Sequence, residues 1–177
     1  MKELTKQALA SSLRKLLEQR PISQITVKDI AQDCGVNRQT FYYHFQDIYD
    51  LFFWSMGREL RKYITSKKID QTDMSAYLRA LFDYFRKNER RFRHGYDPVN
   101  RVQYETIFAE RIGPLLAARL RTYPEAETVA AEDIDFLASF YTLSISGLMI
   151  KWIEEGMPDE CCVQLDKYCL VLYLYRR

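Results

Sequence analysis

The spacing of apolar residues follows the period of an α-helix along most of the chain. Apolar positions that recur three and four residues apart mark one face of a helix. Residues 1–20 show this spacing, and Pro21 should end the helix, because the residue before a proline is pushed out of helical geometry. The apolar stripe of this helix consists of Leu9, Leu13, Leu16 and Leu17. We predict that Ile22 and Ile25, in the loop that follows, fill the small core beneath it.

Residues 26–45 predict two short helices joined by a tight turn. Thr26 is a good N-cap, and Asp29 can reach back to it in a capping box. The apolar stripe of the first helix consists of Val27, Ile30, Ala31 and Cys34. Gly35 should end this helix, since glycine accepts the left-handed conformation of a sharp exit, and Asn37 should cap the next one.

The second of these helices has an outer face without an acidic residue. At 100° per residue, Phe41 and Phe45 fall on one side, toward the core, while Gln39 and Tyr43 point away. Hydrogen-bond donors and acceptors on such a face suit phosphates and base edges in a DNA major groove. We assign base contacts to Arg38, Gln39, Thr40 and Tyr43, and phosphate contacts to Thr26, Lys28, Tyr42 and His44. The alternative is a solvated face on a small three-helix domain.

Residues 48–66 predict a long fourth helix, which Asp47 caps and a polar link at residues 67–72 follows. Asp73 should cap the next helix. The apolar stripe of that helix consists of Met74, Tyr77, Leu78, Leu81, Phe82 and Phe85. The basic run at residues 87–94 suits either a second DNA site or a solvated helix end whose cations favour the helix dipole, and we favour the helix end.

Another helix should begin at Pro98, because proline is favoured in a first turn, and should end near Pro124. Its inward residues are Phe108, Ile112, Leu115, Leu116 and Leu120. Pro114 should kink or interrupt it, because proline cannot donate the helical hydrogen bond.

The last two predicted helices, residues 132–155 and the helix that Pro158 opens, are apolar on nearly all sides. In so short a chain, this pattern favours one face packed inward and another paired with a second copy in a two-fold four-helix bundle. The predicted dimer residues are Phe136, Phe140, Leu143, Gly147, Ile150, Val163, Leu170, Val171 and Leu174. The alternative is a buried hairpin in a monomer.

The composition is that of a soluble globular protein, with 47% hydrophobic and 28% charged residues among 177. A net charge of +2 is too small to indicate a nucleic-acid binder, so DNA contacts must depend on local arrangement. The first residues lack the apolar stretch of a signal peptide, and no run approaches the roughly 20 apolar residues of a membrane span. We therefore expect a cytoplasmic protein without a membrane partner, with reduced thiols.

The remaining chemistry does not indicate an enzyme. The chain has no Gly-rich phosphate loop, nucleophile elbow or HExxH motif, and we expect no cofactor. With only two His, no His-based metal site is available. Cys161, Cys162 and Cys169 could suggest thiol metal binding or redox sensing, but no fourth ligand is evident and helical Cys usually pack as small apolar residues.

Several aromatic residues of the C-terminal part could line a small-molecule pocket, with phenol groups as polar handles. These residues are Tyr77, Phe82, Phe85, Tyr104, Phe108, Tyr141 and Trp152. The alternative, that they only fill the core, is equally compatible with the sequence.

The motif GVNRQTFYYHF, with the upstream ITVKDIA, closely resembles the DNA-binding domain of the TetR/AcrR family of bacterial transcriptional regulators. The following FQDIYDLFFW resembles the subgroup associated with dihydroxyacetone kinase operons. The resemblance implies a helix-turn-helix head at residues 1–47 and a regulatory, dimerising body at residues 48–177. Where many relatives carry a Lys that contacts a DNA phosphate, this chain has Ile48.

The resemblance further implies a homodimer on a palindromic DNA operator, usually as a repressor, that responds to a small-molecule effector or a sensor protein partner. In the named subgroup the partner can be a kinase-like sensor. The alternative function is therefore a helix-turn-helix-derived co-activator or interaction module that acts through such a partner.

Overall fold

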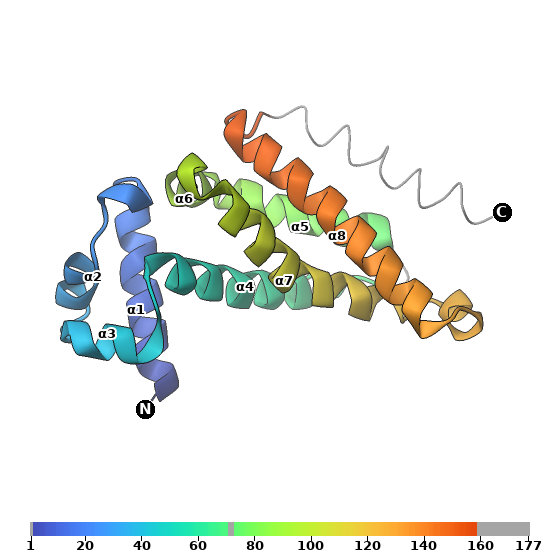
Figure 1. The fold of residues 1–177 in the computed structure, drawn as a ribbon, viewed down its shortest axis with the longest axis horizontal. Coiled ribbons are helices and arrows are strands. Elements are labelled where there is room, and N and C mark those ends of the chain that lie inside the picture. The colour runs from blue at the N-terminus through green and yellow to red at the C-terminus, as the bar shows by residue number, and fades with distance from the viewer. Residues whose placement is uncertain (1, 71–72, 159–177) are drawn as a thin grey trace. The chain divides into compact units, whose positions relative to one another are not determined.

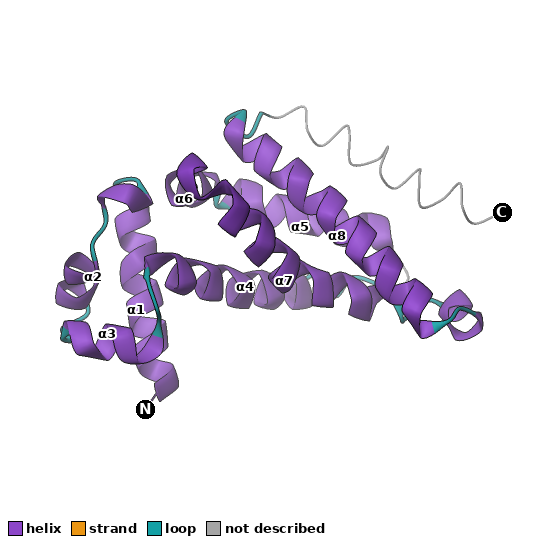
Figure 2. Cartoon of the chain, viewed as in Figure 1, coloured by secondary structure: helices purple, strands orange, loops and turns teal. Residues whose placement is uncertain are grey.

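The structure is a computed structural model that describes residues 2–70 and 73–158. Every regular element in this part of the chain is a helix, which confirms the all-α prediction (Figure 2). The helices form two compact units. The first holds the residues up to 59 together with residues 88–99, and the second holds the other described residues.

The helices follow one another with short connections (Figure 1). The α-helices are α1 (Lys2–Leu17), α2 (Val27–Asp33), α3 (Arg38–His44), α4 (Ile48–Ser66), α5 (Met74–Lys87), α6 (Glu89–Gly95), α7 (Arg101–Leu120) and α8 (Ala131–Glu154). Short 3₁₀ helices lie at Ile22–Gln24, Pro98–Asn100 and Pro124–Thr128.

The first unit has a small core that α1, α2, α3 and the start of α4 enclose. Its fully buried side chains include Leu9, Leu13, Leu17, Ile30, Phe41 and Leu51. Ile22 and Ile25 are buried at 3% and 4% exposure, which confirms that this loop fills the core. The Ser12 hydroxyl donates a hydrogen bond to the carbonyl of Ile30 and ties α1 to α2 at 3.3 Å.

The basic run at residues 87–94 is divided between the end of α5, at Lys87, and a short separate helix, α6, which the sequence did not predict. The expected cations do lie at helix ends, with Arg93 and His94 in the last turn of α6. Phe92 is 4% exposed and packs edge-on against Phe52 of α4, with ring centroids 6.0 Å apart. Gly95 lies so close to Phe52 that a Cβ at this position would come within 2.5 Å of its ring. Apolar burial and close approach therefore attach α6 to the first unit.

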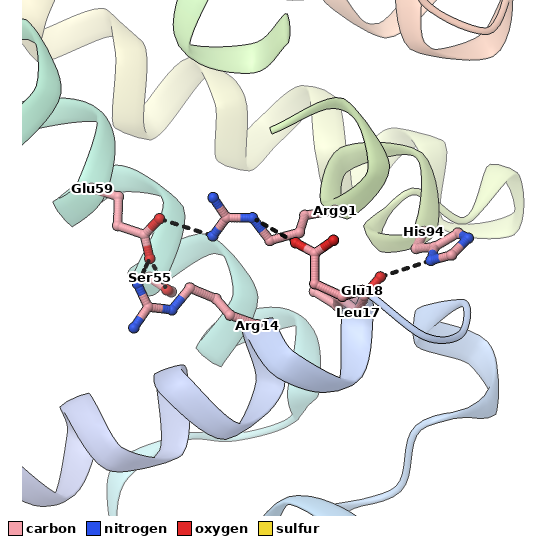
Figure 3. Close-up of polar contacts among 7 residues, drawn as sticks. All are labelled: Arg14, Leu17, Glu18, Ser55, Glu59, Arg91 and His94. Carbon is pink, nitrogen blue, oxygen red and sulfur yellow. Dashed lines mark hydrogen bonds and ion pairs between the residues drawn. The ribbon is translucent and has the colours of Figure 1, made fainter. Parts of the chain in front are cut away.

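Polar contacts join α6 to α1 and α4 (Figure 3). Arg91 contacts Glu59 at 3.2 Å and Glu18 at 3.4 Å, and Arg14 contacts the other oxygen of Glu59 at 2.9 Å. The Nδ1 atom of His94 lies 2.7 Å from the carbonyl oxygen of Leu17, at the end of α1. Arg91 and His94 thus help to hold α6 against α1 and α4.

The second unit contains the rest of α4 with α5, α7 and α8. Asp73 caps α5 as predicted, accepting a hydrogen bond from the Ala76 amide at 2.8 Å. The whole predicted stripe of α5 is buried. α7 packs against α8, and it continues through Pro114 without a break, so Pro114 does not interrupt it.

α8 buries one side and exposes another. Its buried residues include Ile134, Ala138, Ile145, Met149 and Trp152. Gly156 ends the helix as expected, with a φ of +83°. By length and composition alone α8 could cross a membrane, which corrects the expectation that no segment would meet this criterion, although the buried core helix of a soluble protein meets it too.

The predicted dimer residues of α8 fall into two groups. Phe136, Phe140 and Leu143 are exposed at 70%, 52% and 67%. Ile150 is completely buried, so its assignment to an exposed interface is wrong. Gly147 has open space where a Cβ would point. The other dimer residues, Val163, Leu170, Val171 and Leu174, lie outside the described residues, as do Cys161, Cys162 and Cys169.

Candidate nucleic-acid interface

The start of α2 is fixed by a reciprocal capping box. The Asp29 amide donates to the Thr26 hydroxyl oxygen at 3.2 Å, and the Thr26 amide donates to the Asp29 carboxylate at 2.9 Å. Both hydrogen bonds of the predicted box are therefore present. The hydrogen bonds from Thr26 also hold the pKa of the Asp29 carboxyl below its ordinary value, so this cap stays charged and intact near neutral pH.

The turn between α2 and α3 has the predicted geometry. Gly35 has a φ of +68°, a left-handed conformation that residues with a Cβ adopt only at a cost. The Val36 amide then donates back to the Ala31 carbonyl at 2.9 Å and closes the end of α2. Asn37 caps α3 through its side-chain oxygen, which accepts from the Thr40 amide at 2.7 Å and the Thr40 hydroxyl at 2.9 Å.

α3 is divided into an inner apolar face and an outer polar face. Phe41 and Phe45 are buried at 0% and 3% exposure, as their spacing predicted. Tyr42 and Tyr43 are exposed at 59% and 66%. Arg38 and Gln39 are exposed as well, and Thr40 and His44 are half-buried. The outer face therefore presents a guanidinium, an amide and two phenols from one rigid helix.

The N-terminal part of α1 adds two cations beside α3. Lys2 places its ammonium 5.3 Å from the ring centroid of Tyr43, and Lys6 lies 5.5 Å from that of Phe45. The predicted site does not include these lysines, because the sequence alone does not show that they lie near DNA. Their spacing of four positions, which puts both on one side of α1, is the signal that could have found them.

The charges of α1 reach the end of α3. Partial burial, and then the positive charges of Lys6 and Lys2, lower the pKa of His44 below its ordinary value. The Lys2 ammonium is favoured in turn by its contact with the phenol of Tyr43, which raises the lysine pKa. The C-terminal end of α3 thus lies in a locally positive environment, although the whole chain is nearly neutral.

The predicted phosphate contacts on α2 differ in availability. Lys28 is exposed. The Thr26 hydroxyl donates to Asp29 at 2.8 Å and is therefore already engaged. Ile48, in the position where a relative's Lys would contact phosphate, is half-buried at the start of α4. Asp47 caps that helix through a 2.8 Å hydrogen bond from the Asp50 amide.

The aromatic residues predicted to line a ligand pocket occupy the second unit. Phe82 packs against Trp152 with ring centroids 5.5 Å apart, and Phe85 stacks on Phe108 at 5.7 Å. Tyr104 is 1% exposed. The other two line separate spaces. Tyr77 borders a cleft of about 210 Å³, and Tyr141 borders a cavity of about 10 Å³, room for no more than one water molecule.

Two family profiles match the chain. A profile described as bacterial regulatory proteins, tetR family, matches residues 9–53. A profile described as a transcriptional regulator C-terminal region matches residues 72–163, about half of the chain. Among curated proteins, 105 residues are 27% identical to the HTH-type dhaKLM operon transcriptional activator DhaS of Lactococcus lactis subsp. lactis (strain IL1403). This match covers 59% of the chain and spans about half, 49%, of the relative's length.

Solved structures show the same fold at low identity. The dihydroxyacetone kinase operon activator DhaS aligns with a TM-score of 0.56 and 16% identity, over 97% of this chain and 95% of that one. The TetR family repressor AlkX from Dietzia sp. strain DQ12-45-1b aligns with a TM-score of 0.68 and 17% identity, over 95% of both chains. These findings confirm the predicted helix-turn-helix head and helical body.

Proposed function

Since the chain belongs to the TetR family of bacterial transcriptional regulators, which bind DNA, we propose that α3 enters the major groove of an operator and reads its bases. The observation that carries this proposal is the outer face of α3. This face holds no acidic residue. The caps at Thr26 and Asn37 fix the starts of α2 and α3, and Gly35 forms the turn that joins the two helices. Lys2 and Lys6 extend the face with positive charge toward the DNA backbone.

Each predicted base contact has a chemical role on this face. Arg38 can bind guanine with two parallel hydrogen bonds, and Gln39 can bind adenine in the same way. Thr40 has its hydroxyl bound to Asn37, so its methyl group is the part that meets a base, where it suits the methyl of thymine. The exposed phenol of Tyr43 completes the reading set.

Phosphate contacts would position the helix rather than select the sequence. Lys28 and Tyr42 are exposed, and His44 is half-buried at the end of α3. Thr26 reaches a phosphate only by exchanging its hydrogen bond to Asp29. Because Ile48 supplies no such contact, the salt dependence of binding should be flatter by roughly one unit of slope than in relatives with Lys there.

Two copies of the head would bind a palindromic operator when their recognition helices are about 34–36 Å apart, or a multiple of that spacing. A ligand or partner protein that favours another spacing would release the DNA by population shift. In this proposal, residues 1–47 bind DNA, residues 48–177 dimerise and receive the signal, and the protein acts in the cytoplasm as a repressor.

Activation is a second candidate function. The curated relative is named as a transcriptional activator, whereas one structural neighbour is a repressor. Transcription in vitro from the protein's own upstream promoter distinguishes the two. Repression lowers the amount of transcript when the protein alone is added, and activation through a partner raises it only when the partner is present.

The direct test is fluorescence anisotropy of the purified protein on its own upstream DNA and on random DNA, at several salt concentrations. Tyr43→Ala should weaken binding to the operator fragment by about 5- to 150-fold, equivalent to about 1–3 kcal/mol for a base contact, and leave binding to random DNA nearly unchanged. Arg38→Gln should relax the sequence preference at one base position.

Arg93→Gln is the matched control for Arg38→Gln, because each removes one positive charge from the first unit. Arg93 is exposed on α6, where it pairs with Glu89 at 3.2 Å, away from the α3 face. The Arg93→Gln substitution should leave the sequence preference of DNA binding intact. Equal losses for the two arginines, or equal binding of operator and random DNA by the unmodified protein, would refute reading by α3.

A further inference from the structure

The second unit has a cleft that, among the residues the structure describes, is lined by two arginines and by no carboxylate. It has a volume of about 210 Å³, and the end of α4, the start of α5 and the end of α7 enclose it. Drug-sized ligands occupy about 300–1,000 Å³, so this space suits a smaller molecule. Arg61 and Arg119 supply its charge, while Ile64 and Leu115 supply apolar wall.

Arg119 is a buried cation whose hydrogen bonding is incomplete. Arg119 is only 9% exposed. Its Nη2 group donates to the backbone carbonyls of Asp70 and, at 3.1 Å, of Asp73, and its guanidinium lies 5.3 Å from the ring centroid of Tyr77. Its Nε atom is buried and has no hydrogen-bond partner among the described residues. Within the described part of the chain, none of these contacts is with a carboxylate.

A buried charge of this kind is costly unless an opposite charge accompanies it. Arg61 is exposed and lines the same cleft, so the second charge adds repulsion rather than relief. An anion in the cleft would offset the positive charge of both guanidinium groups. Guanidinium groups suit carboxylate and phosphate because they donate parallel hydrogen bonds.

Neutral groups around the cleft fit the same ligand. Burial raises the pKa of Tyr77 to about 12, against a smaller opposing effect of Arg119, so its phenol is protonated at neutral pH. Thr65 adds a hydroxyl to the lining. The apolar lining of Ile64, Leu115 and Ala118 suits a short apolar tail.

We propose that this cleft binds a small organic anion, a carboxylate or phosphate with a short apolar tail, through Arg119 and Arg61. The bound anion competes for the guanidinium that holds the carbonyls of Asp70 and Asp73, in the link between α4 and α5. Ligand binding would therefore change the stability of that link. The proposed anion binding does not depend on the proposed DNA-binding function.

The test is calorimetric titration of the full-length protein, without DNA, with inorganic phosphate, hexanoate and the neutral hexanamide. At least one anion should bind, and hexanamide should bind at least about tenfold more weakly, because the charge-assisted hydrogen bonds are absent. If only inorganic phosphate binds, the site is selective for a phosphate group. If only hexanoate binds, the site is selective for a carboxylate with an apolar tail.

Three variants locate the site. Arg61→Gln should weaken anion binding about tenfold, consistent with the loss of one charged hydrogen bond. Ala118→Leu should abolish it by filling the cleft, and both residues are exposed, so the fold should persist. Arg111→Gln is the matched control, because Arg111 is an exposed arginine of α7 that does not line the cleft.

The proposal is overturned if neither anion binds, or if Arg111→Gln weakens binding as much as Arg61→Gln. Binding that survives in both Arg61→Gln and Ala118→Leu would place the anion elsewhere and would also overturn it. Circular dichroism confirms the fold of each variant. The titrations contain no DNA, so their results do not depend on whether the protein recognises an operator. DNA recognition is measured separately by anisotropy.

Discussion

His44 is the residue whose charge depends most directly on its neighbours at the proposed DNA face. Partial burial and the charges of Lys6 and Lys2 lower its pKa in the free protein, so it is neutral at pH 7. A DNA phosphate beside it would favour the protonated ring and raise the pKa in the complex. Between these two pKa values, DNA binding takes up a proton, and affinity must rise as the pH falls.

We therefore expect operator affinity to increase as the pH falls through the pKa of His44 in the complex, and to level off below the lowered pKa of the free protein. Anisotropy titrations at fixed salt between pH 5.5 and 8 measure this dependence. His44→Gln should bind with the same affinity at both ends of the range, apart from effects shared with other groups. A pH dependence that persists unchanged in this variant would show that His44 does not contact phosphate.

The roles of single residues could be predicted from sequence where a residue type strongly favours one local structure, such as a helix cap or a turn. Thr26, Asp29, Gly35 and Asn37 have side chains or conformations suited to caps and turns, and all four take the expected roles. Such prediction failed for Arg119, since nothing in the sequence distinguishes a buried arginine that lines a cleft from the solvated arginines along the same helix. Only the packing of α4 and α5 around it reveals the difference.

At the scale of elements, α6 is the helix that the sequence missed. Its seven residues hold a single large apolar side chain, Phe92, which is too few to show a helical period. Five neighbouring charged or basic positions suggested a solvated end, yet Arg91 is used for ion pairs with two other helices. The close approach of Gly95 to Phe52 is a three-dimensional requirement that leaves no trace in the local pattern.

That close approach gives a prediction for the stability of the first unit. Gly95→Ala would place a methyl group within 2.5 Å of the buried Phe52 ring, and overpacking of this kind typically costs about 1–3 kcal/mol. We expect a loss of that size in the free energy of unfolding, measured by chemical denaturation. The helix preference of alanine over glycine offsets up to about 1 kcal/mol of it.

A double-mutant cycle separates overpacking from other effects of the substitution. Phe52→Leu removes the ring that the new methyl group would meet, and by itself it should destabilise the unit because the ring is buried. In the double variant with Gly95→Ala, the combined loss should be smaller than the sum of the two single losses. Strict additivity would mean that the steric contact does not cause the effect.

At the scale of the whole molecule, the exposed face of α8 decides how the protein assembles. Phe136, Phe140 and Leu143 follow one another at helical spacing and remain exposed on one side of the helix. A soluble protein rarely leaves such a row of large apolar groups uncovered. Periodicity predicted the fold class, and together with the caps and the glycine turn it predicted the head. What covers this face of α8 cannot be identified from periodicity.

We propose that a second copy covers this face, and Phe140→Glu tests it. A charge at the centre of an apolar interface is costly to bury, so the variant should be monomeric in analytical ultracentrifugation at a concentration where the unmodified protein is a dimer. Operator affinity should fall with it, because the operator then meets one head at a time and the gain from joint binding is lost, typically about 10²–10⁴-fold.

Val102→Glu is the control, since Val102 is 74% exposed on α7 and belongs to no predicted interface. It should leave both mass and affinity unchanged. If instead the same chain covers the exposed side of α8, Phe140→Glu would lower the free energy of unfolding at constant molecular mass. The mass measurement thus separates assembly from folding, and only a loss of mass together with a loss of operator affinity supports a dimer whose two heads bind DNA jointly.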